Sequence, residues 1–232
     1  MMTFTCFQCP IDFVAARDEA CKLLLDKRNF IHTVAHSDAV HSNALRIWDG
    51  SCPDGKEEDL VALKLACYWH DTGRNDRDSV EQTPHEVESV RLFSEFARRS
   101  GYPQRIVDTV VRAILSHRNR GGRGDGLTDC LSDILWDADK LDIVNPHRVL
   151  EILWGFQAGY SAGEFSWRSS LDYWKGISVK FVERLHFDES RRLFLERYDG
   201  FSELIVQMEA FLASNHEFVA RTSRVPNREG II

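Results

Sequence analysis

Apolar side chains recur every three or four residues along most of the chain. This is the pattern of amphipathic α-helices, and the alternation typical of β-strands is almost absent. Prolines, glycines and short polar runs separate the apolar stretches. The predicted helices cover residues 11–25, 33–48, 57–70, 84–100, 103–117, 129–141, 146–156, 169–185 and 202–213. We therefore predict an all-α fold.

The predicted helices form a single bundle, because no internal repeat and no linker of domain scale interrupts them. The predicted core with the candidate site covers residues 29–142, and an N-terminal helix at residues 1–28 packs on it. C-terminal helices at residues 143–214 complete the same domain, and residues 215–232 form a flexible tail. Loops are short except 118–126 and 155–167, which makes these two loops candidates for the rim of a site.

Size and charge limit the function. The chain has 232 residues, of which 43% are hydrophobic and 28% charged, values ordinary for a soluble globular protein with one well-buried core. Its net charge of −7 gives no bulk attraction to nucleic acid or lipid surfaces. We see no signal-like segment and no apolar run near the ~18 residues of a membrane span. We expect a cytoplasmic protein that recruits any anionic substrate through local cations.

Five predicted helices carry a histidine or an aspartate at one end of an apolar stripe, judged by the spacing that places residues on one helix face. These residues are His36, His70, His85, His117 and Asp139. One such histidine is usually a core residue satisfied by a backbone carbonyl, but five coincidences are much less expected.

The dipeptide His70-Asp71 ends an apolar helical stretch, where an ionised aspartate is costly unless a cation or hydrogen-bond donors satisfy it. Neutral histidine and ionised aspartate are ligands that borderline and hard divalent metals prefer. Groups of this type that converge at helix ends form a metal pocket inside a bundle.

The order of these residues resembles the HD-domain family of metal-dependent phosphohydrolases. The matching residues are His36, the dyad extended as His70-Asp71-Thr72-Gly73-Arg74, and the closing run Asp137-Ala138-Asp139-Lys140-Leu141-Asp142. The resemblance covers residues 29–142 and implies a helical bundle of the HD-domain type.

The resemblance also implies which residues bind a divalent metal ion, namely His36, His70, Asp71 and Asp139. Members with two metals have additional histidines where this chain has His85 and His117. These two histidines either hold a second metal with Asp71 as the bridge, which we favour, or stay metal-free and steer the substrate or protonate its leaving group. Mn, Mg, Fe, Ni, Co and Zn all accept such a site.

By the same resemblance we expect hydrolysis of a phosphoester or phosphoanhydride in a small phosphorylated molecule, and nucleotides are the family's commonest substrates. The metal lowers the pKa of a bound water and binds the phosphoryl oxygens. Asp71 orients the water, while Arg74 or Lys140 binds the substrate and offsets the developing charge. On loop 118–126, Arg118, with Arg120 and Arg123, either reaches a phosphate or remains a solvated charge.

Two other functions suit the same residues. A few HD-fold proteins resembling myo-inositol oxygenase bind two irons with this order of four histidines and two aspartates, so a di-iron oxygenase is the first alternative. The second is a non-catalytic regulatory module stabilised by its metal, which the presence of every expected ligand disfavours.

Other polar residues are predicted to lie away from the metal. Asp137 points about 200° from Asp139 around its helix, either into solvent or behind the ligands. His32 and His41 lie off the stripe of His36, with surface or supporting roles. The residues given no role are His147, His186 and His216.

The cysteines and tryptophans are predicted to be mainly structural. Cys6 and Cys9 have zinc or redox spacing, but no second pair completes a site. Cys21 and Cys67 lie on apolar helix faces. Trp69 and Trp136 pack in the core or, alternatively, shield the site from water.

Overall fold

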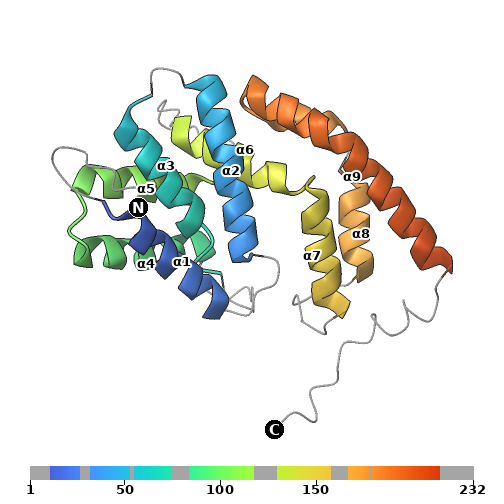
Figure 1. The fold of residues 1–232 in the computed structure, drawn as a ribbon, viewed down its shortest axis with the longest axis horizontal. Coiled ribbons are helices and arrows are strands. Elements are labelled where there is room, and N and C mark those ends of the chain that lie inside the picture. Colours follow the sequence, from blue (N-terminus) through green and yellow to red (C-terminus); the bar gives the residue numbers. More distant parts are fainter. Residues whose placement is uncertain are drawn as a thin grey trace, which may run out of the picture.

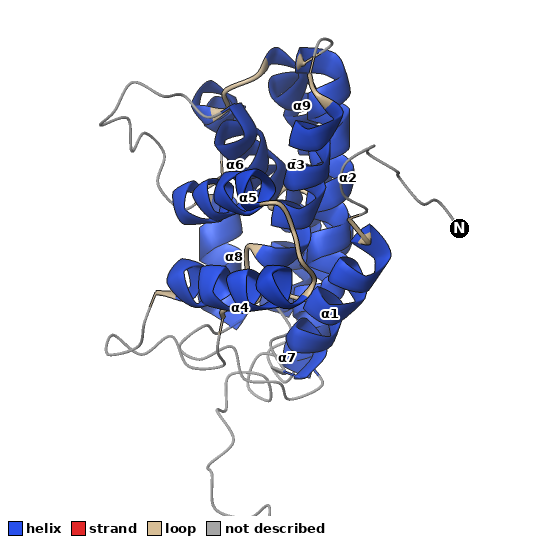
Figure 2. Cartoon of the chain, turned by 90° about the vertical axis from the view of Figure 1, so that its left-hand side faces the viewer, coloured by secondary structure: helices blue, strands red, loops and turns tan. Residues whose placement is uncertain are grey.

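The computed structural model describes residues 11–26, 32–52, 55–74, 84–117, 130–157, 167–177 and 179–214, with the backbone alone at 152–157 and 167–169. Within these ranges the chain forms α-helices and one short 3₁₀ helix, and no strand (Figures 1 and 2). The elements are α1 (Phe13–Asp26), α2 (Val34–Ser51), α3 (Glu57–Trp69), α4 (His85–Arg99), α5 (Gln104–Ser116), α6 (Cys130–Asp142), α7 (Pro146–Gln157), α8 (Trp167–Lys175), η1 (Val179–Arg184) and α9 (Asp188–Ser214). The predicted all-α fold is confirmed.

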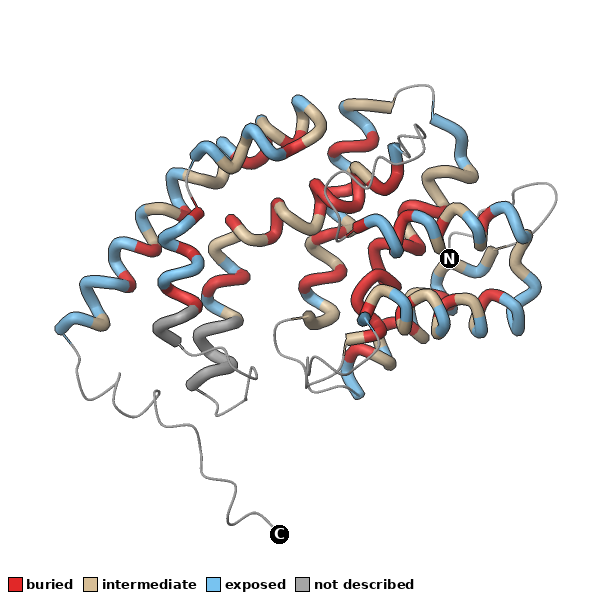
Figure 3. The backbone as a smooth tube through the Cα atoms, turned by 180° about the vertical axis from the view of Figure 1, so that it is seen from behind, coloured by how far each residue is buried: buried red, intermediate tan, exposed pale blue. Residues whose placement is uncertain are grey.

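Helices α2 and α6 pack against each other at the centre of the molecule (Figure 1). On one side α3 packs on α2, α5 on α3, and α4 on α5; on the other side α9 contacts both α2 and α6. Buried residues follow the inward faces of the helices and exposed residues the outward faces (Figure 3). One hydrophobic cluster extends from Ala16 to Met208, so the site described below is built into a continuous core.

Local signals start and stop the helices that carry the site. The Thr33 hydroxyl accepts a hydrogen bond from the backbone N–H of His36 at 3.3 Å, which caps the N-terminus of α2. Three acidic residues occupy the first turn of α3, where they face the positive end of the helix dipole. Gly101, with φ of 69°, follows the end of α4 and reverses the chain before Pro103.

The turn after α3 lies directly against the start of α4. A Cβ atom on Gly73 would lie 2.0 Å from the His85 carbonyl oxygen and 2.4 Å from the Ser89 nitrogen, so only glycine fits. The Gly73 N–H donates to the Ser89 hydroxyl at 2.8 Å, and that hydroxyl donates to the His70 carbonyl at 2.8 Å. This close approach brings His70 and His85 into one region.

Three predicted helix boundaries were wrong. The predicted helix 169–185 is divided into α8 and η1, because the chain turns at Gly176 and Ile177. The predicted helix 202–213 begins 14 residues earlier, at Asp188, because α9 continues through Gly200, where there is open space beside the backbone. Pro84 is the N-cap of α4 rather than its first residue.

None of the described helices combines the length and apolarity needed to cross a lipid bilayer.

Candidate metal centre

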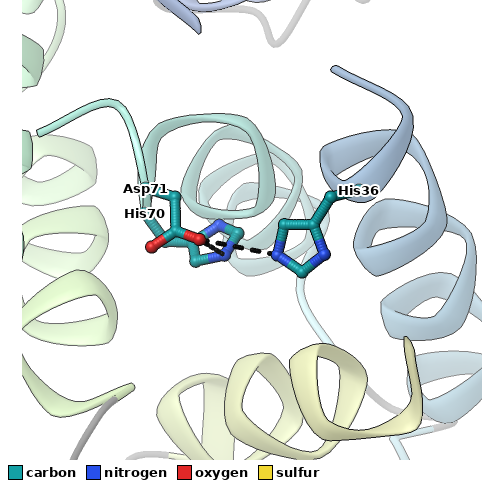
Figure 4. A group of neighbouring side chains, drawn as sticks. All are labelled: His36, His70 and Asp71. Atoms are coloured by element: carbon teal, nitrogen blue, oxygen red, sulfur yellow. Dashed lines mark ion pairs between the residues drawn. The ribbon is translucent and has the colours of Figure 1, made fainter. Parts of the chain in front are cut away.

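The carboxylate of Asp71 lies at the centre of a buried group of histidines. Its Oδ2 atom is 3.5 Å from Nε2 of His36 and 3.3 Å from Nε2 of His70 (Figure 4). Its Oδ1 atom is 3.3 Å from Nε2 of His85 and 3.9 Å from Nε2 of His117. Each carboxylate oxygen therefore faces one pair of imidazoles.

Four helices supply these five side chains, each near one of its ends. His36 lies in the first turn of α2, His70 is the C-cap of α3, and Asp71 follows in the turn. His85 is the first residue of α4, and His117 is the C-cap of α5. The predicted convergence of helix ends is thus present, and all five residues are buried.

The histidines are oriented so that Nε2 faces the centre. Nδ1 of His70 donates to the Cys67 carbonyl at 2.9 Å, and Nδ1 of His117 donates to the Ile114 carbonyl. Nδ1 of His36 donates to the Asp142 carboxylate at 2.8 Å. Because Nδ1 is engaged in each case, Nε2 is the nitrogen left to bind a metal, which is the arrangement of a metal-binding imidazole.

The buried Nε2 atoms of His36 and His70 have no hydrogen-bond partner, an arrangement that is costly unless another ligand satisfies them. Ligand atoms of His36, His70 and Asp71 all lie within 4.8 Å of one another, as do those of Asp71, His85 and His117. The two groups share Asp71. The donor set fits one divalent ion in each group, with Asp71 common to both.

Asp139, on α6, approaches the first group at His36. Its Oδ1 atom is 3.4 Å from Nε2 of His36, while its Oδ2 atom accepts a hydrogen bond from Lys140 Nζ at 2.7 Å. Asp139 thus meets His36 but lies outside the tighter group of His36, His70 and Asp71. The Lys140 ammonium also lies 5.9 Å from the centre of the Trp136 ring.

The electrostatics of the centre favour a cation. Burial disfavours protonated His36, but the carboxylates of Asp139, Asp142 and Asp71 outweigh burial and raise its pKa to about 10, so a metal bound at Nε2 would displace a proton there. Burial also opposes ionisation of Asp71, yet the Arg74 charge and His70 keep its pKa well below the usual range. Burial lowers the pKa of His117 to about 4, so this imidazole is neutral at pH 7 and suited to bind metal.

Two further cationic or polar side chains reach Asp71. Arg74 donates from Nε to Oδ1 at 2.8 Å, which places the predicted substrate-binding guanidinium at the edge of the centre. Nε2 of His32 lies 3.7 Å from Oδ2, and its ring meets that of His36 edge-on. His32 is therefore a neighbour of the ligands and not a surface residue.

A buried ion pair behind His36 was missed in the sequence. Asp142 binds His36 on one side and lies 3.3 Å from Nε of Arg148 on the other; both are buried. Arg148 belongs to α7, so a C-terminal helix supports a candidate metal ligand on α2. The signal for Asp142 was its place at the close of the run 137–142, whereas no local pattern marks Arg148.

Asp137 and His186 form a second pair whose roles the sequence misjudged. Asp137 is fully buried and not solvated. Its carboxylate accepts hydrogen bonds from the backbone N–H groups of His186 and Phe187, at 2.9 and 3.2 Å, and binds Nδ1 of His186 at 2.8 Å. Asp137 therefore fixes the start of α9, and His186 has a structural role.

Four other residues singled out in the sequence are Trp69, Trp136, His147 and Cys67. Trp69 is buried against Phe93 and Phe96, as predicted for a core residue. Trp136 is also buried and stacks parallel to Phe181. His147 is exposed, and Cys67 is buried. The predicted sites at Arg118, Arg120, Arg123, His216, Cys6 and Cys9 lie outside the described residues.

Comparison with known families gives one match, and it covers the segment that supplies the centre. The family described as HD domain matches residues 30–143. This range includes all six candidate ligands and ends just after Asp142. No curated protein matches the chain in sequence.

Solved structures with similar folds include proteins from three bacteria. Bacillus subtilis YpgQ in complex with ADP is 17% identical, with 85% of this chain and 93% of that chain covered and a TM-score of 0.56. The Lin1889 protein of Listeria innocua is 15% identical, with coverage of 85% and 93% and a TM-score of 0.56. A Lactobacillus plantarum protein is 14% identical, with coverage of 92% and 100% and a TM-score of 0.63. At these identities the likeness establishes the fold.

Proposed function

We propose that the protein hydrolyses a phosphoester or phosphoanhydride bond of a nucleotide, because residues 30–143 match the HD domain family, whose members are mostly metal-dependent hydrolases. The proposal names a reaction and a substrate class, with a divalent metal as cofactor.

The observation that carries this proposal is the position of Asp71 between two pairs of imidazoles. His36 and His70 approach one of its oxygens, and His85 and His117 approach the other. We propose that His36, His70, Asp71 and Asp139 hold one metal ion and that His85 and His117 hold a second, with Asp71 as the common ligand. A bound divalent ion lowers the pKa of a coordinated water and polarises phosphoryl oxygens.

The side chains around the ligands support an anionic substrate. Arg74 and Lys140 are cations within hydrogen-bond distance of Asp71 and Asp139, at 2.8 and 2.7 Å. A phosphate that reaches the centre can replace these carboxylates and accept a hydrogen bond from Arg74 or from Lys140. We therefore assign to Arg74 and Lys140 the binding of phosphoryl oxygens, and to Asp71 the orientation of the attacking water.

A nucleotide is the preferred substrate class because the structural neighbour from Bacillus subtilis was crystallised with ADP. The net charge of −7 implies that local cations and the metal, and not the overall field, attract such a substrate.

The test is phosphate or pyrophosphate release from a panel of nucleotides and simple phosphoesters, with Mn²⁺, Mg²⁺, Co²⁺, Ni²⁺, Fe²⁺ or Zn²⁺ added separately. We expect turnover with at least one pair of metal and nucleotide, and a loss of 10²-fold or more in Asp71→Ala and Asp139→Ala. A matched control is Asp133→Ala, which removes a carboxylate from α6 away from the centre.

Activity that survives in both Asp71→Ala and Asp139→Ala would contradict the site. Two tightly held irons in the purified protein, together with oxygen uptake, would replace the hydrolase with the di-iron oxygenase. Stoichiometric metal binding without turnover of any substrate in the panel would favour the regulatory module.

A further inference from the structure

Two cysteines face each other at the ends of α2 and α6 that lie far from the metal centre. Cys52 is the C-cap of α2, held by a hydrogen bond from its N–H to the Trp48 carbonyl at 2.8 Å, and Cys130 is the first residue of α6. Their Sγ atoms are 3.3 Å apart, and both residues are thiols. A disulfide needs an S–S distance of about 2.05 Å, so a movement of about 1.3 Å would join them.

The pair is accessible and separate from the metal centre. Cys130 is exposed and Cys52 half-buried, whereas Cys67 is fully buried and burial raises its pKa. Along α2, Cys52 follows His36 by 16 positions, which corresponds to about 24 Å of helix. Reagents that reach Cys130 therefore need not approach the ligands.

We propose that Cys52 and Cys130 form a reversible disulfide when the protein meets a small-molecule disulfide as oxidant. The exposed thiolate of Cys130 attacks one sulfur of the reagent, whose S–S bond breaks and releases one thiol. The thiolate of Cys52 then attacks Sγ of Cys130 in the mixed disulfide and releases the second thiol. Two protein thiols are oxidised, the reagent disulfide is reduced to two thiols, and these thiols take up the two protons.

The disulfide would link the two helices that cross at the centre of the fold. It joins residues 78 positions apart, so it removes much conformational freedom from the unfolded chain. Since α2 carries His36 and α6 carries Asp139, the link would also hold together the helices that bring these ligands to the centre.

The experiment is disulfide mapping of the full-length protein after incubation with oxidised glutathione, followed by alkylation of the remaining thiols and digestion with trypsin. Residues 47–56 and 124–140 are tryptic peptides with one cysteine each, and the remaining cysteines lie on other peptides. We expect these two peptides to be recovered as one linked species that dithiothreitol separates. We also expect oxidation to raise the thermal midpoint by about 5 °C or more.

Serine variants of single cysteines test which thiols form the disulfide. Cys52→Ser and Cys130→Ser should each lose the linked peptides and the rise in thermal midpoint, while Cys21→Ser should retain both. Recovery of the two peptides as alkylated thiols, or each with its own bound glutathione, would overturn the proposal. An equal rise in midpoint for Cys52→Ser would overturn it as well.

Discussion

At the scale of single residues, Asp142 supports the candidate metal centre by contacting His36, although Asp142 is not itself a candidate ligand. Its carboxylate receives the Nδ1 proton of His36 and in turn contacts the Arg148 guanidinium. This contact fixes both the tautomer of His36 and the direction of its Nε2 lone pair.

We expect Asp142→Asn to weaken metal binding by about 10- to 100-fold, because a neutral amide holds the imidazole less firmly. Calorimetric titration of the metal-free protein with Mn²⁺ measures the effect. Glu151→Gln is the matched control, since Glu151 contacts Arg148 at 3.0 Å from the more exposed side. Equal affinities of the Asp142→Asn variant and the unsubstituted protein would show that Asp142 does not orient His36.

His41 provides a residue-scale test of pH dependence. Burial, with a smaller effect of the Lys64 charge, lowers its pKa to about 4 in the folded protein, and its Nε2 atom has no hydrogen-bond partner. In the unfolded chain its pKa is near 6.5. Between pH 6.5 and 4 the unfolded state therefore binds more protons, so the free energy of unfolding decreases as the pH falls through this window.

We expect this histidine to account for about 2 kcal/mol of the decrease, allowing for its partial exposure. Urea unfolding at a series of pH values should show a shallower slope for His41→Phe than for the unsubstituted protein. His147→Gln, at an exposed histidine, is the matched control. Parallel curves for His41→Phe would refute the assignment.

The convergence of the candidate ligands could be predicted from the sequence, because a histidine or aspartate at the end of an apolar stripe is a local pattern. Asp142 could be suspected from its place at the close of the run 137–142. Arg148 and His186 could not, because their roles depend on which distant helix they meet. Helical periodicity shows that Asp137 points away from Asp139, but it does not show whether Asp137 faces water or the N–H groups of His186 and Phe187, just before α9.

At the scale of elements, the start of α9 depends on Asp137. The first N–H groups of a helix have no partner within the helix, and here a buried carboxylate on α6 satisfies those that lead into it.

We expect Asp137→Ala to reduce the free energy of unfolding by about 3 kcal/mol, because it leaves buried donors of His186 and Phe187 without acceptors. Asp133→Ala, one turn earlier on α6 and partly exposed, should cost less than about 1 kcal/mol. Urea unfolding of both variants provides the comparison. Equal losses would mean that α9 does not depend on this anchor.

Most helices could be predicted from periodicity and capping residues, with ends within a few residues of those observed. The exception was the segment from 169 to 201. There Gly176 stops a helix that the apolar pattern continues, while Gly200 lies inside a helix that tertiary contacts maintain. The intrinsic preference of glycine is the same at both positions, so only packing distinguishes them.

At the scale of the molecule, the proposed metal connects helices that are distant in sequence. The first group of ligands joins α2 to α3, and Asp139 adds α6. A ligand that binds only the folded state stabilises it in proportion to the logarithm of one plus the ratio of its free concentration to its dissociation constant.

We therefore expect Mn²⁺ at about 100 times its dissociation constant to raise the thermal midpoint by about 5–10 °C relative to protein in EDTA. Scanning fluorimetry measures the shift. Asp71→Ala should show little response to Mn²⁺, since it lacks the ligand common to both groups. A shift of the same size in Asp71→Ala would indicate that Mn²⁺ binds elsewhere.

The pairing of α2 with α6 also affects how the protein is made. The hydrogen bond between His36 and Asp142 spans 106 positions, and that between Asn43 and the Ala138 carbonyl spans 95. On the ribosome, α2 thus emerges long before the helix that covers it. Until α6 has left the exit tunnel, the apolar face of α2 is available to chaperones, and the nascent chain has imidazoles without their orienting carboxylate.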